Sequence, residues 1–294
     1  MTTRDTAAKH ALPLTVVLVI IGLLWYLGAI WLNAPQVVDQ LNRAGPDWTA
    51  RDLIEGTWSM ERPVLPTPDQ VATEFWKTTA GTAITSKRSL FYHTWITASA
   101  TLLGFIVGTM LGVALAIGIV HLSVLDRSLL PWIVASQTVP ILAVAPMIIV
   151  VLGNIGVTGL IPKAAISAYL SFFPVTIGMV KGLRSPDVLQ LDLMHTYNAS
   201  KSQVLWKLRW PASLPFLFAS LKVSVAISLV GAIVGELPTG ATAGLGARLL
   251  TGSYYGQTIQ IWSALLMAAL LGCILVLLIG FTERVTQGRM GARS

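Results

Sequence analysis

Long apolar runs alternate along the chain with stretches rich in charge, proline and glycine. A run of about 17–25 apolar residues is long enough to cross the hydrocarbon core of a bilayer as a helix. In that core a segment must satisfy its own backbone hydrogen bonds, which a helix does and a lone strand does not. The pattern predicts an all-α membrane protein with six transmembrane helices, over Leu14–Leu32, Trp95–Val120, Leu130–Gly153, Ala164–Val180, approximately Leu214–Leu237, and Ile261–Phe281.

The first apolar run follows Arg4 and Lys9, so a cleaved signal peptide is an alternative interpretation. The run is longer than the apolar region of a signal peptide, which has about 7–15 residues. The nearest cleavage site, at Ala34, has Leu32 where a small residue is needed. We therefore expect a retained helix, with residues 1–32 forming a short tail and the first span.

Residues 33–93 break the apolar pattern, because charged residues, tryptophans and prolines are spread through them. This stretch cannot span a membrane, and we expect it to form an extracytoplasmic or interfacial segment. Within it, Val71, Phe75 and Trp76 follow helical spacing over Pro68–Thr79, which is typical of a helix lying in the interface. A solvated loop is the alternative, and both interpretations stay open.

Composition supports a membrane protein and excludes other classes. Hydrophobic residues make up 54% of the chain and charged residues 11%, whereas soluble domains carry about 25% charged residues. The chain is too apolar for a soluble globular protein, a disordered chain or a nucleic-acid-binding module, in spite of its net charge of +7. A basic excess in an apolar chain is typical of Lys and Arg retained on the cytoplasmic side of a membrane.

Basic residues in the short connections predict the orientation. With the N-terminus inside, two of them, Lys163 and Arg248, fall outside and eleven fall in the cytoplasm. The eleven are Arg4, Lys9, Arg127, Lys181, Arg184, Lys201, Lys207, Arg209, Arg284, Arg289 and Arg293. Because basic loops stay in the cytoplasm, we expect both termini inside. Residues 94–281 then form a five-helix core with a cytoplasmic loop, 185–213, between the fourth and fifth spans, and 282–294 form a basic tail.

The second span carries small residues at every fourth position, Gly104, Gly108, Gly112 and Ala116. Residues four apart lie on one face of a helix. A stripe of small side chains lets a second helix approach closely, and in lipid such packing drives association. We expect this stripe to be a helix-packing face.

Polar residues within the spans are few. Ser136, Gln137 and Thr138 precede Pro140 in the third span, where proline disturbs the helix and frees carbonyl groups. These side chains either hydrogen-bond neighbouring helices or line a translocation pathway. Glu236, at the end of the fifth span, is either a solvated carboxylate or part of the same pathway.

No catalytic or metal-binding constellation is expected, and no cofactor. The four histidines are scattered, and no metalloprotease, nucleophile-elbow or phosphate-loop motif occurs. An intramembrane enzyme is therefore disfavoured. The single cysteine, Cys273, lies in the sixth span, where we expect a small buried residue. Lys222 lies in the fifth span, within snorkelling reach of the interface. No relay of acidic residues or histidines lies within the spans, which argues against the main alternative, an ion-coupled secondary transporter or channel.

The loop between the fourth and fifth spans carries a spaced motif. It consists of Asp192, Leu193, Met194, Asn198, Leu208, Trp210 and Pro211. This spacing resembles the EAA loop in permease subunits of binding-protein-dependent ABC importers, where Glu-Ala-Ala, three residues, Gly and nine residues precede Ile-x-Leu-Pro. Asp192 keeps the charge of the Glu, and Asn198 replaces Gly with the residue that next most readily adopts positive φ. Leu193 and Met194 depart from the alanines.

Other segments resemble the nitrate, sulfonate and taurine branch of these permeases, between about residues 63 and 250. They are Pro63–Pro68, Leu103-Gly104-Phe105, Val139-Pro140-Ile141, Ala145-Pro146, Phe172-Phe173-Pro174, Ala212–Pro215, Gly235-Glu236 and Gly244-Leu245-Gly246.

The resemblance implies a permease of the cell inner membrane that pairs with a second copy and forms the pathway for a small solute, such as nitrate, a sulfonate, taurine or a pyrimidine-like compound. It also implies cytoplasmic ATPase subunits that bind ATP and Mg²⁺ and dock on the loop, and an extracytoplasmic solute-binding protein. We expect a coupling helix over Val188–Lys207, stopped by Trp210-Pro211. An ordinary loop whose charges serve topology alone is the alternative.

Overall fold

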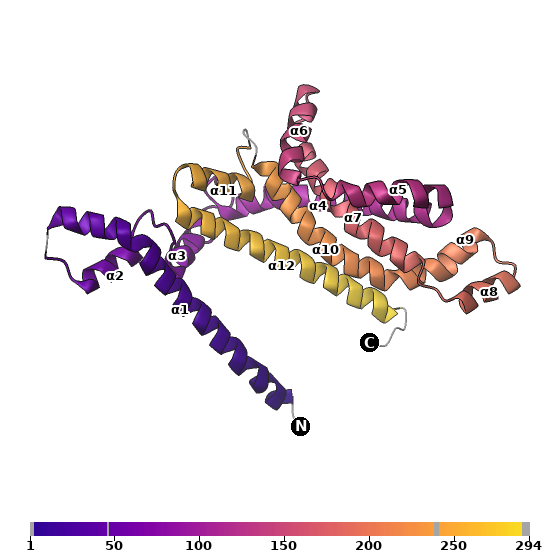
Figure 1. Cartoon of the computed structure of the whole chain (residues 1–294), viewed down its shortest axis with the longest axis horizontal. Helices are drawn as coiled ribbons and strands as arrows, with labels where there is room; N and C mark the ends of the chain where they lie inside the picture. The colour runs from indigo at the N-terminus through magenta and orange to yellow at the C-terminus, as the bar shows by residue number, and fades with distance from the viewer. Residues whose placement is uncertain (1–2, 46, 238–240, 290–294) are drawn as a thin grey trace. The chain divides into compact units, whose positions relative to one another are not determined.

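The computed structural model describes residues 3–45, 47–237 and 241–289, and in these ranges it contains helices and no strand. Figure 1 labels the helices. They are α1 Thr3–Ala44, α2 Ala50–Ser59, α3 Pro68–Thr79, α4 Leu90–His121, α5 Ser123–Ser136, α6 Ile141–Asn154, α7 Leu160–Leu183, α8 Val188–Thr196, α9 Lys201–Val204, the π-helical turn η1 Leu205–Arg209, α10 Trp210–Glu236, α11 Leu245–Tyr254 and α12 Thr258–Arg289. The expected all-α class is confirmed.

The chain divides into two compact units. Unit 1 holds the residues up to 90 together with 248–266, and unit 2 holds 91–247 with the residues from 267 onward. Part of the expected C-terminal tail, including Arg293, lies outside the described residues, as do the side chains of Arg4, Lys9 and Arg289.

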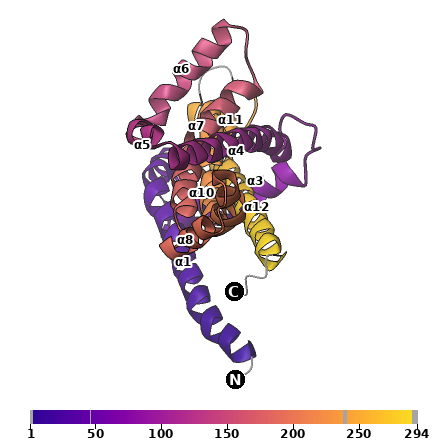
Figure 2. The same ribbon diagram turned by 90° about the vertical axis from the view of Figure 1, so that its right-hand side faces the viewer.

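Five helices are long and apolar enough to cross a membrane, and a sixth span results if α5 and α6 are counted together. The third expected span, Leu130–Gly153, in which proline was expected to disturb the helix, falls on α5 and α6, which meet at an angle of 99°. Pro140 explains the break. Proline offers no backbone N–H and disfavours a helical conformation at the preceding residue, here Val139. Figure 2 shows α6 turning away from the neighbouring helices of unit 2.

Within unit 2, α4, α7 and α10 lie side by side (Figure 1). Thr97, near the start of α4, and Lys163, near the start of α7, both contact Glu236 at the end of α10. At the other end, Arg209 donates to the carbonyl oxygen of Leu183, the last residue of α7 (2.8 Å). We call this second end the hairpin end, because α8 and α9 follow there. Helices α4 and α7 therefore run in the same direction and α10 runs back.

The glycine stripe of α4 lies against α7. A Cβ atom at Gly108 would stand 2.9 Å from the carbonyl oxygen of Ala168, and one at Gly112 would stand 2.7 Å from that of Phe172. At Gly104 an added Cβ would stand 2.6 Å from the carbonyl oxygen of Ala164. These separations leave no room for a side chain, so the close approach of the two helices requires glycine at all three positions.

Serine hydroxyls join α4, α7 and α10 through the buried interior. The hydroxyl oxygens of Ser167 and Ser228 lie 2.6 Å apart, and Ser228 also donates to the carbonyl oxygen of Thr101 on α4. Ser224 donates to the carbonyl oxygen of Ser171 at 2.7 Å. In lipid a buried hydroxyl has no water to bind, so each of these serines binds the neighbouring helix instead. An apolar cluster that includes Val175, Met179 and Leu183 completes the core toward the hairpin end.

One expectation about a single side chain is corrected. Cys273 is exposed on the chain and not buried. The reason is the face of α12 that it occupies: Leu270, Ile274 and Leu277 beside it are exposed too, whereas the opposite face packs on the chain. Lys222, for which snorkelling stays a prediction, has its ammonium 2.5 Å from the carboxylate of Glu283 on α12.

Unit 1 is organised around Asn33 on α1, whose side chain is fully buried. Its amide nitrogen donates to the carbonyl oxygens of Thr57 and Leu65, and its amide oxygen accepts from the backbone of Val64. A buried amide is stable only when its donors and acceptor are satisfied. Asn33 thus fixes α2 and the proline-rich segment 63–68 on α1.

The segment Pro68–Thr79 is a helix, as one of the two interpretations required. It begins at a capping box of Thr67 and Gln70, with proline in its first turn. Val71 packs inward and Trp76 is 71% exposed. Its location in a membrane interface stays a prediction.

Candidate functional site

The motif between α7 and α10 forms a hairpin of two short helices, α8 and α9. Local sequence explains both starts. The backbone N–H of Asp187 donates to the side-chain oxygen of Gln190 (3.2 Å), and that of Ser200 donates to Gln203 (2.8 Å). Both are capping boxes, in which residues three apart satisfy the free groups of the first helical turn.

Asn198 turns the chain between the two helices. Its φ of 51° is the only positive φ among the non-glycine residues that the structure describes. The amide of Ala199 donates back to the carbonyl oxygen of Met194 (3.0 Å), which closes the end of α8. The expected continuous helix over Val188–Lys207 is therefore wrong, because the left-handed residue ends α8 and Ser200 starts a new helix.

Trp210-Pro211 does not stop a helix, as had been expected, but lies within a helical stretch from Lys201 to Glu236. The π-helical turn η1 explains why. The backbone N–H of Trp210 donates to the carbonyl oxygen of Leu205, five residues earlier. A proline in an α-helix clashes with the carbonyl group four residues before it, and a wider turn relieves the clash.

The predicted coupling residues fall into two groups. Asp192, Leu193, Met194 and Asn198 lie on the hairpin itself, whereas Leu208, Trp210 and Pro211 lie at its base in η1 and the start of α10. Asp192, Leu193 and Asn198 are exposed, and Met194 is half-buried.

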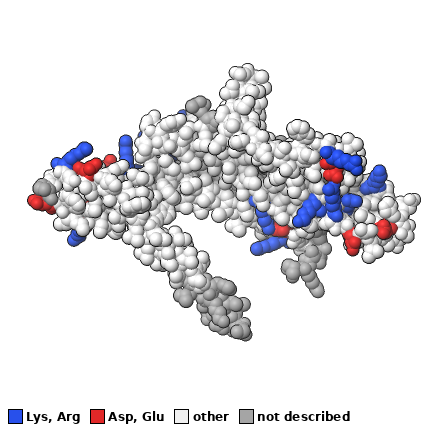
Figure 3. Space-filling model, in the orientation of Figure 1, with Lys and Arg blue, Asp and Glu red and all other residues white. Residues whose placement is uncertain are grey.

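The hairpin also presents an apolar face that the sequence analysis missed. Leu189, Leu193 and Tyr197 follow one another at four-residue spacing and are 77%, 56% and 77% exposed. Large apolar side chains gathered on a polar loop mark a surface that binds another protein. The spacing was visible in the sequence, but the charged residues around it obscured the pattern. Figure 3 shows basic side chains gathered over this end of unit 2.

The candidate pathway residues Ser136, Gln137 and Thr138 lie at the break between α5 and α6. The hydroxyl of Thr138 donates to the carbonyl oxygen of Ala135 (2.8 Å), and Tyr169 of α7 donates to that of Ser136 (2.7 Å). Side chains thus satisfy carbonyl groups that the broken helix leaves free. Gln137 and Thr138 are exposed on the single chain.

Glu236 is not with these residues, and it is not solvated as one interpretation held. Its carboxylate is fully buried and lies 3.7 Å from the ammonium of Lys163. It accepts hydrogen bonds from the hydroxyl of Thr97 (3.0 Å) and from the backbone of Gly246 (2.8 Å). A buried charge is stable only when it is paired and hydrogen-bonded in this way.

The same cluster holds the chain that leads into α11. The backbone of Gly244 donates to His93, and that of Leu245 donates to Thr97. Gly244 has a φ of +127°, and a Cβ there would collide with the Glu236 carboxylate. The contribution of His93 and Thr97 could not be predicted from the sequence, since both lie at the start of α4, far from Glu236 along the chain.

A pocket of about 560 Å³ opens beside this cluster. Its polar lining includes Tyr92, Ser99, Lys163 and Thr242, and Ile149 of α6 forms part of its apolar wall. A cavity of this size with few polar groups is suited to a small solute.

Comparison with known proteins relates the chain to transport systems. Residues 104–290 match the family described as binding-protein-dependent transport system inner membrane component. The riboflavin transport system permease protein RibX of Chloroflexus aurantiacus is 33% identical over 222 residues, which cover 76% of this chain and 79% of the relative. The formylaminopyrimidine transport permease protein ThiX of Halalkalibacterium halodurans is 31% identical, with 62% and 68% covered. The putative aliphatic sulfonates transport permease protein SsuC of Bacillus subtilis is 27% identical, with 75% and 76% covered.

Proposed function

The chain belongs to the family of inner membrane components of binding-protein-dependent transport systems, and we propose that it forms the pathway for a small solute and couples it to ATP hydrolysis. It is a multi-pass protein of the inner membrane and the permease subunit of an ABC importer. A permease of this family is not itself catalytic. ATP and Mg²⁺ then bind to separate cytoplasmic ATPase subunits, and this chain needs no cofactor.

The exposed apolar face of the α8–α9 hairpin carries the coupling proposal. Leu189, Leu193 and Tyr197 project from a hairpin whose turn is fixed by Asn198, and Asp192 lies on the same helix. Such a surface suits a groove on the ATPase, with apolar burial for affinity and the carboxylate for register. Arg209 and the ion pair of Arg184 with Asp126 (2.9 Å) fix the base of the hairpin on α7 and α5.

The proposed topology has six spans with both termini in the cytoplasm. The ion pair of Asp126 with Arg184 places the start of α5 at the hairpin end, and α7 begins at the opposite end, beside Glu236. This arrangement supports the proposal that the α5–α6 pair crosses from one end to the other as a broken span. The basic residues of the short connections favour a cytoplasmic hairpin.

A second permease copy would complete the pathway. Gln137 and Thr138 are exposed on the single chain, yet they lie in a span, where lipid offers polar groups no partner. Leu142 and Met147 on α6 beside them are 65% and 67% exposed. A homodimer that packs around this break would enclose the polar residues in a water-filled passage and cover the apolar ones. An extracytoplasmic solute-binding protein would deliver the solute.

The relatives support a small solute of limited range. Their names specify riboflavin, formylaminopyrimidine and aliphatic sulfonates. We propose a solute of this kind, a sulfonate or a heterocyclic compound related to pyrimidines. Nitrate, a small anion, and taurine, a zwitterionic sulfonate, are included in this proposal.

Charge reversal at Asp192 tests the coupling proposal. Breaking a buried charged contact in an interface costs roughly 2–5 kcal/mol of affinity. We expect Asp192→Lys to insert normally in the membrane, to lose the ATPase when the tagged permease is purified, and to abolish uptake. Asp39→Lys reverses an exposed charge on α1 and serves as the matched control, with ATPase binding retained. Full ATPase binding and uptake by Asp192→Lys would disprove the role of the hairpin.

A further inference from the structure

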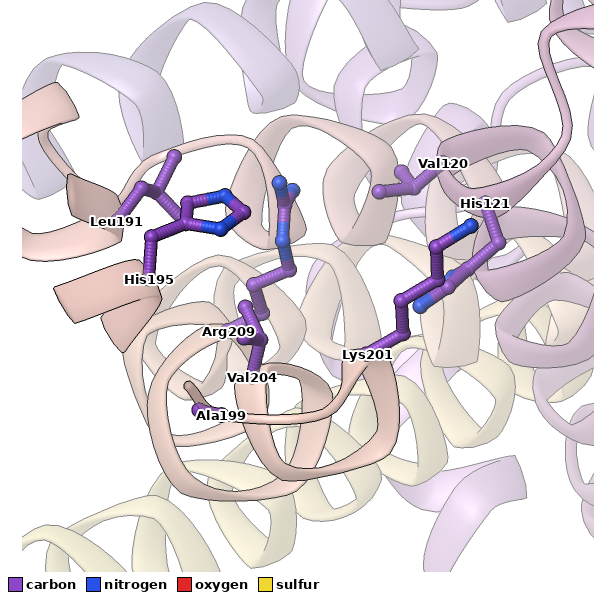
Figure 4. A pocket seen from close by; sticks show the side chains of 8 residues that line it. All are labelled: Val120, His121, Leu191, His195, Ala199, Lys201, Val204 and Arg209. Atoms are coloured by element: carbon purple, nitrogen blue, oxygen red, sulfur yellow. The ribbon is translucent and has the colours of Figure 1, made fainter. Parts of the chain in front are cut away.

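A second, smaller pocket lies at the hairpin end of unit 2. It has a volume of about 270 Å³, enough for several water molecules at about 30 Å³ each. Three segments form it: the end of α4, the helix α8, and the stretch from Ala199 through α9 to η1 (Figure 4). The pocket is separate from the break in α5–α6 and from the cavity beside Lys163.

Four nitrogen-bearing side chains line this pocket, and they are His121, His195, Lys201 and Arg209. None of the described residues that line it is acidic. Figure 4 shows Lys201 extending toward His121, and the Arg209 guanidinium next to the ring of His195. The Lys201 ammonium and the Arg209 guanidinium are two positive charges at one cavity whose lining holds no counter-charge, and this favours an anion inside it.

Donors remain on most of these side chains. His121 donates from Nδ1 to the carbonyl oxygen of Ile117 (2.8 Å), so its Nε2 donates to a ligand only when the ring is doubly protonated. One guanidinium nitrogen of Arg209 donates to the carbonyl oxygen of Leu183, and the other N–H groups remain available to a ligand. The side chains of His195 and Lys201 make no hydrogen bond or ion pair within the described ranges. An anchored guanidinium with a flexible ammonium is a combination suited to phosphate oxygens.

The rest of the wall is apolar. Val120, Leu191 and Val204 form it together with the methyl group of Ala199. A free inorganic ion makes no apolar contact with this wall, whereas the carbon atoms of a phosphate ester can pack against it. The pocket also lies at the end of α4, a candidate membrane span, so the headgroup of a lipid is within its reach.

We propose that this pocket binds a phosphate group, carried either by an anionic phospholipid or by a soluble phosphate compound. Its ligands come from α4, α8, α9 and η1, so an occupied pocket ties the coupling hairpin to the end of a membrane span. Binding would then hold the hairpin in one orientation relative to the core of unit 2. Binding itself requires neither the solute nor the ATPase.

The test measures the thermal unfolding of the purified full chain in detergent, without the ATPase. The titrants are inorganic phosphate, with chloride at equal ionic strength as reference, and phosphatidylglycerol, with phosphatidylcholine as reference. We expect a saturable rise of the unfolding temperature with at least one of the two phosphate carriers. A rise with phosphatidylglycerol alone identifies a lipid, and a rise with inorganic phosphate identifies a soluble ligand.

Variants locate the binding. His195→Gln with Lys201→Gln removes two exposed side chains of the pocket, and each charge-assisted hydrogen bond lost should weaken binding by about tenfold. Lys207→Gln removes an exposed charge of η1 outside the pocket and should leave binding unchanged. The proposal is overturned if neither carrier stabilises the protein beyond its reference. An unaltered response of the double variant, or an equal loss in Lys207→Gln, overturns it as well.

Discussion

Asn198 stands in the left-handed region of backbone conformation at the tip of the hairpin. The left-handed conformation costs residues other than glycine about 1–2 kcal/mol. The cost is lowest for asparagine, because its short side chain can hydrogen-bond to the neighbouring backbone. A β-branched residue is excluded most strongly. The conformation at this one position therefore decides how α9 follows α8.

Replacement of Asn198 separates conformation from chemistry. We expect Asn198→Val to lose ATPase binding, uptake and stimulated ATP hydrolysis, because the turn cannot form, while insertion in the membrane is unchanged. Asn198→Gly restores the conformational freedom without the side chain and should retain all three activities. The measurements are co-purification of the ATPase, solute uptake and ATP hydrolysis. Equal activity of the valine and glycine variants would show that the turn does not matter.

Glu236 leads to a prediction about stability. Removing one partner of a buried ion pair leaves the other charge uncompensated and costs about 3–5 kcal/mol. Glu236→Ala should therefore lower the unfolding temperature in detergent strongly, because Lys163 and the backbone of Gly246 lose their partner. Glu283→Ala is the matched control: its partner Lys222 is 38% exposed, and partly exposed pairs contribute about 0–1 kcal/mol.

Glu236→Gln refines the test. An amide keeps the size of the side chain and an acceptor for Thr97 and Gly246, but it loses the charge that Lys163 faces. We expect a loss of stability between those of the alanine variant and the wild type. If Glu236→Ala is no less stable than Glu283→Ala, the cluster does not hold α4, α7 and α10 together.

For single residues, the sequence predicts the conformation or the contacts of a side chain only when its partners are close in the sequence. The left-handed conformation of Asn198 follows from the residue type and the motif spacing. The partners of Glu236 could not be predicted, because Thr97 lies 139 positions away. The exposure of Cys273 depends on which face of α12 packs on the chain, and an evenly apolar helix does not reveal that face.

At the scale of the elements, α4 and α7 pack closely because α4 has glycine at the contact positions. Gly108→Leu would place a large side chain against Ala168 and Ser171. Overpacking of this kind typically costs about 1–3 kcal/mol, and in a helix pair held by backbone contact we expect the folded permease to be lost. Gly22→Leu on α1 is the control, since an added Cβ there meets nothing within 4 Å. The readout is the yield of monodisperse protein in detergent. A normal yield and normal uptake for Gly108→Leu would contradict a packing role.

The elements also show where sequence patterns fail. Apolar runs predict the presence of α4, α7, α10 and α12, because a sufficiently long apolar run is the main requirement for a membrane-spanning helix. The proline-induced break at Pro140 was foreseen, but not the 99° angle, since tertiary contacts such as Tyr169 with Ser136 set it. The expectation of a helix stop at Trp210-Pro211 is wrong because the rule for proline in an α-helix does not cover a π-helical turn.

For the whole molecule, the proposed topology predicts which surfaces are accessible from each side. Single cysteines at Ser200 and Thr242, both exposed, should react differently with a membrane-impermeant thiol reagent. The background is Cys273→Ser, which removes an exposed thiol. We expect Thr242→Cys to be labelled in intact cells and Ser200→Cys after lysis only, because the basic loops hold the hairpin in the cytoplasm. Labelling of Ser200→Cys from outside would overturn both the orientation and the coupling role.

The sequence alone predicted the class, the family and most span positions, since these depend on composition and spacing. It did not predict the two units or the role of Asn33, whose contacts reach α2 and the proline-rich segment across the fold. The one indication in the sequence is that Asn33, a polar residue, directly follows the apolar run Leu14–Leu32.

The π-helical turn η1 has a consequence for how this architecture can change. It adds one residue to a turn of 3.6, which rotates everything before it by about 100° relative to everything after it. The serines that bind α7 all follow the turn, and the hairpin precedes it. Deleting one residue within Leu205–Arg209 would therefore rotate the hairpin, return Pro211 to an α-helical turn with its steric clash, and disturb the packing of the buried Leu205. The orientation of the hairpin and the tolerance of Pro211 within the helix thus depend on the same extra residue.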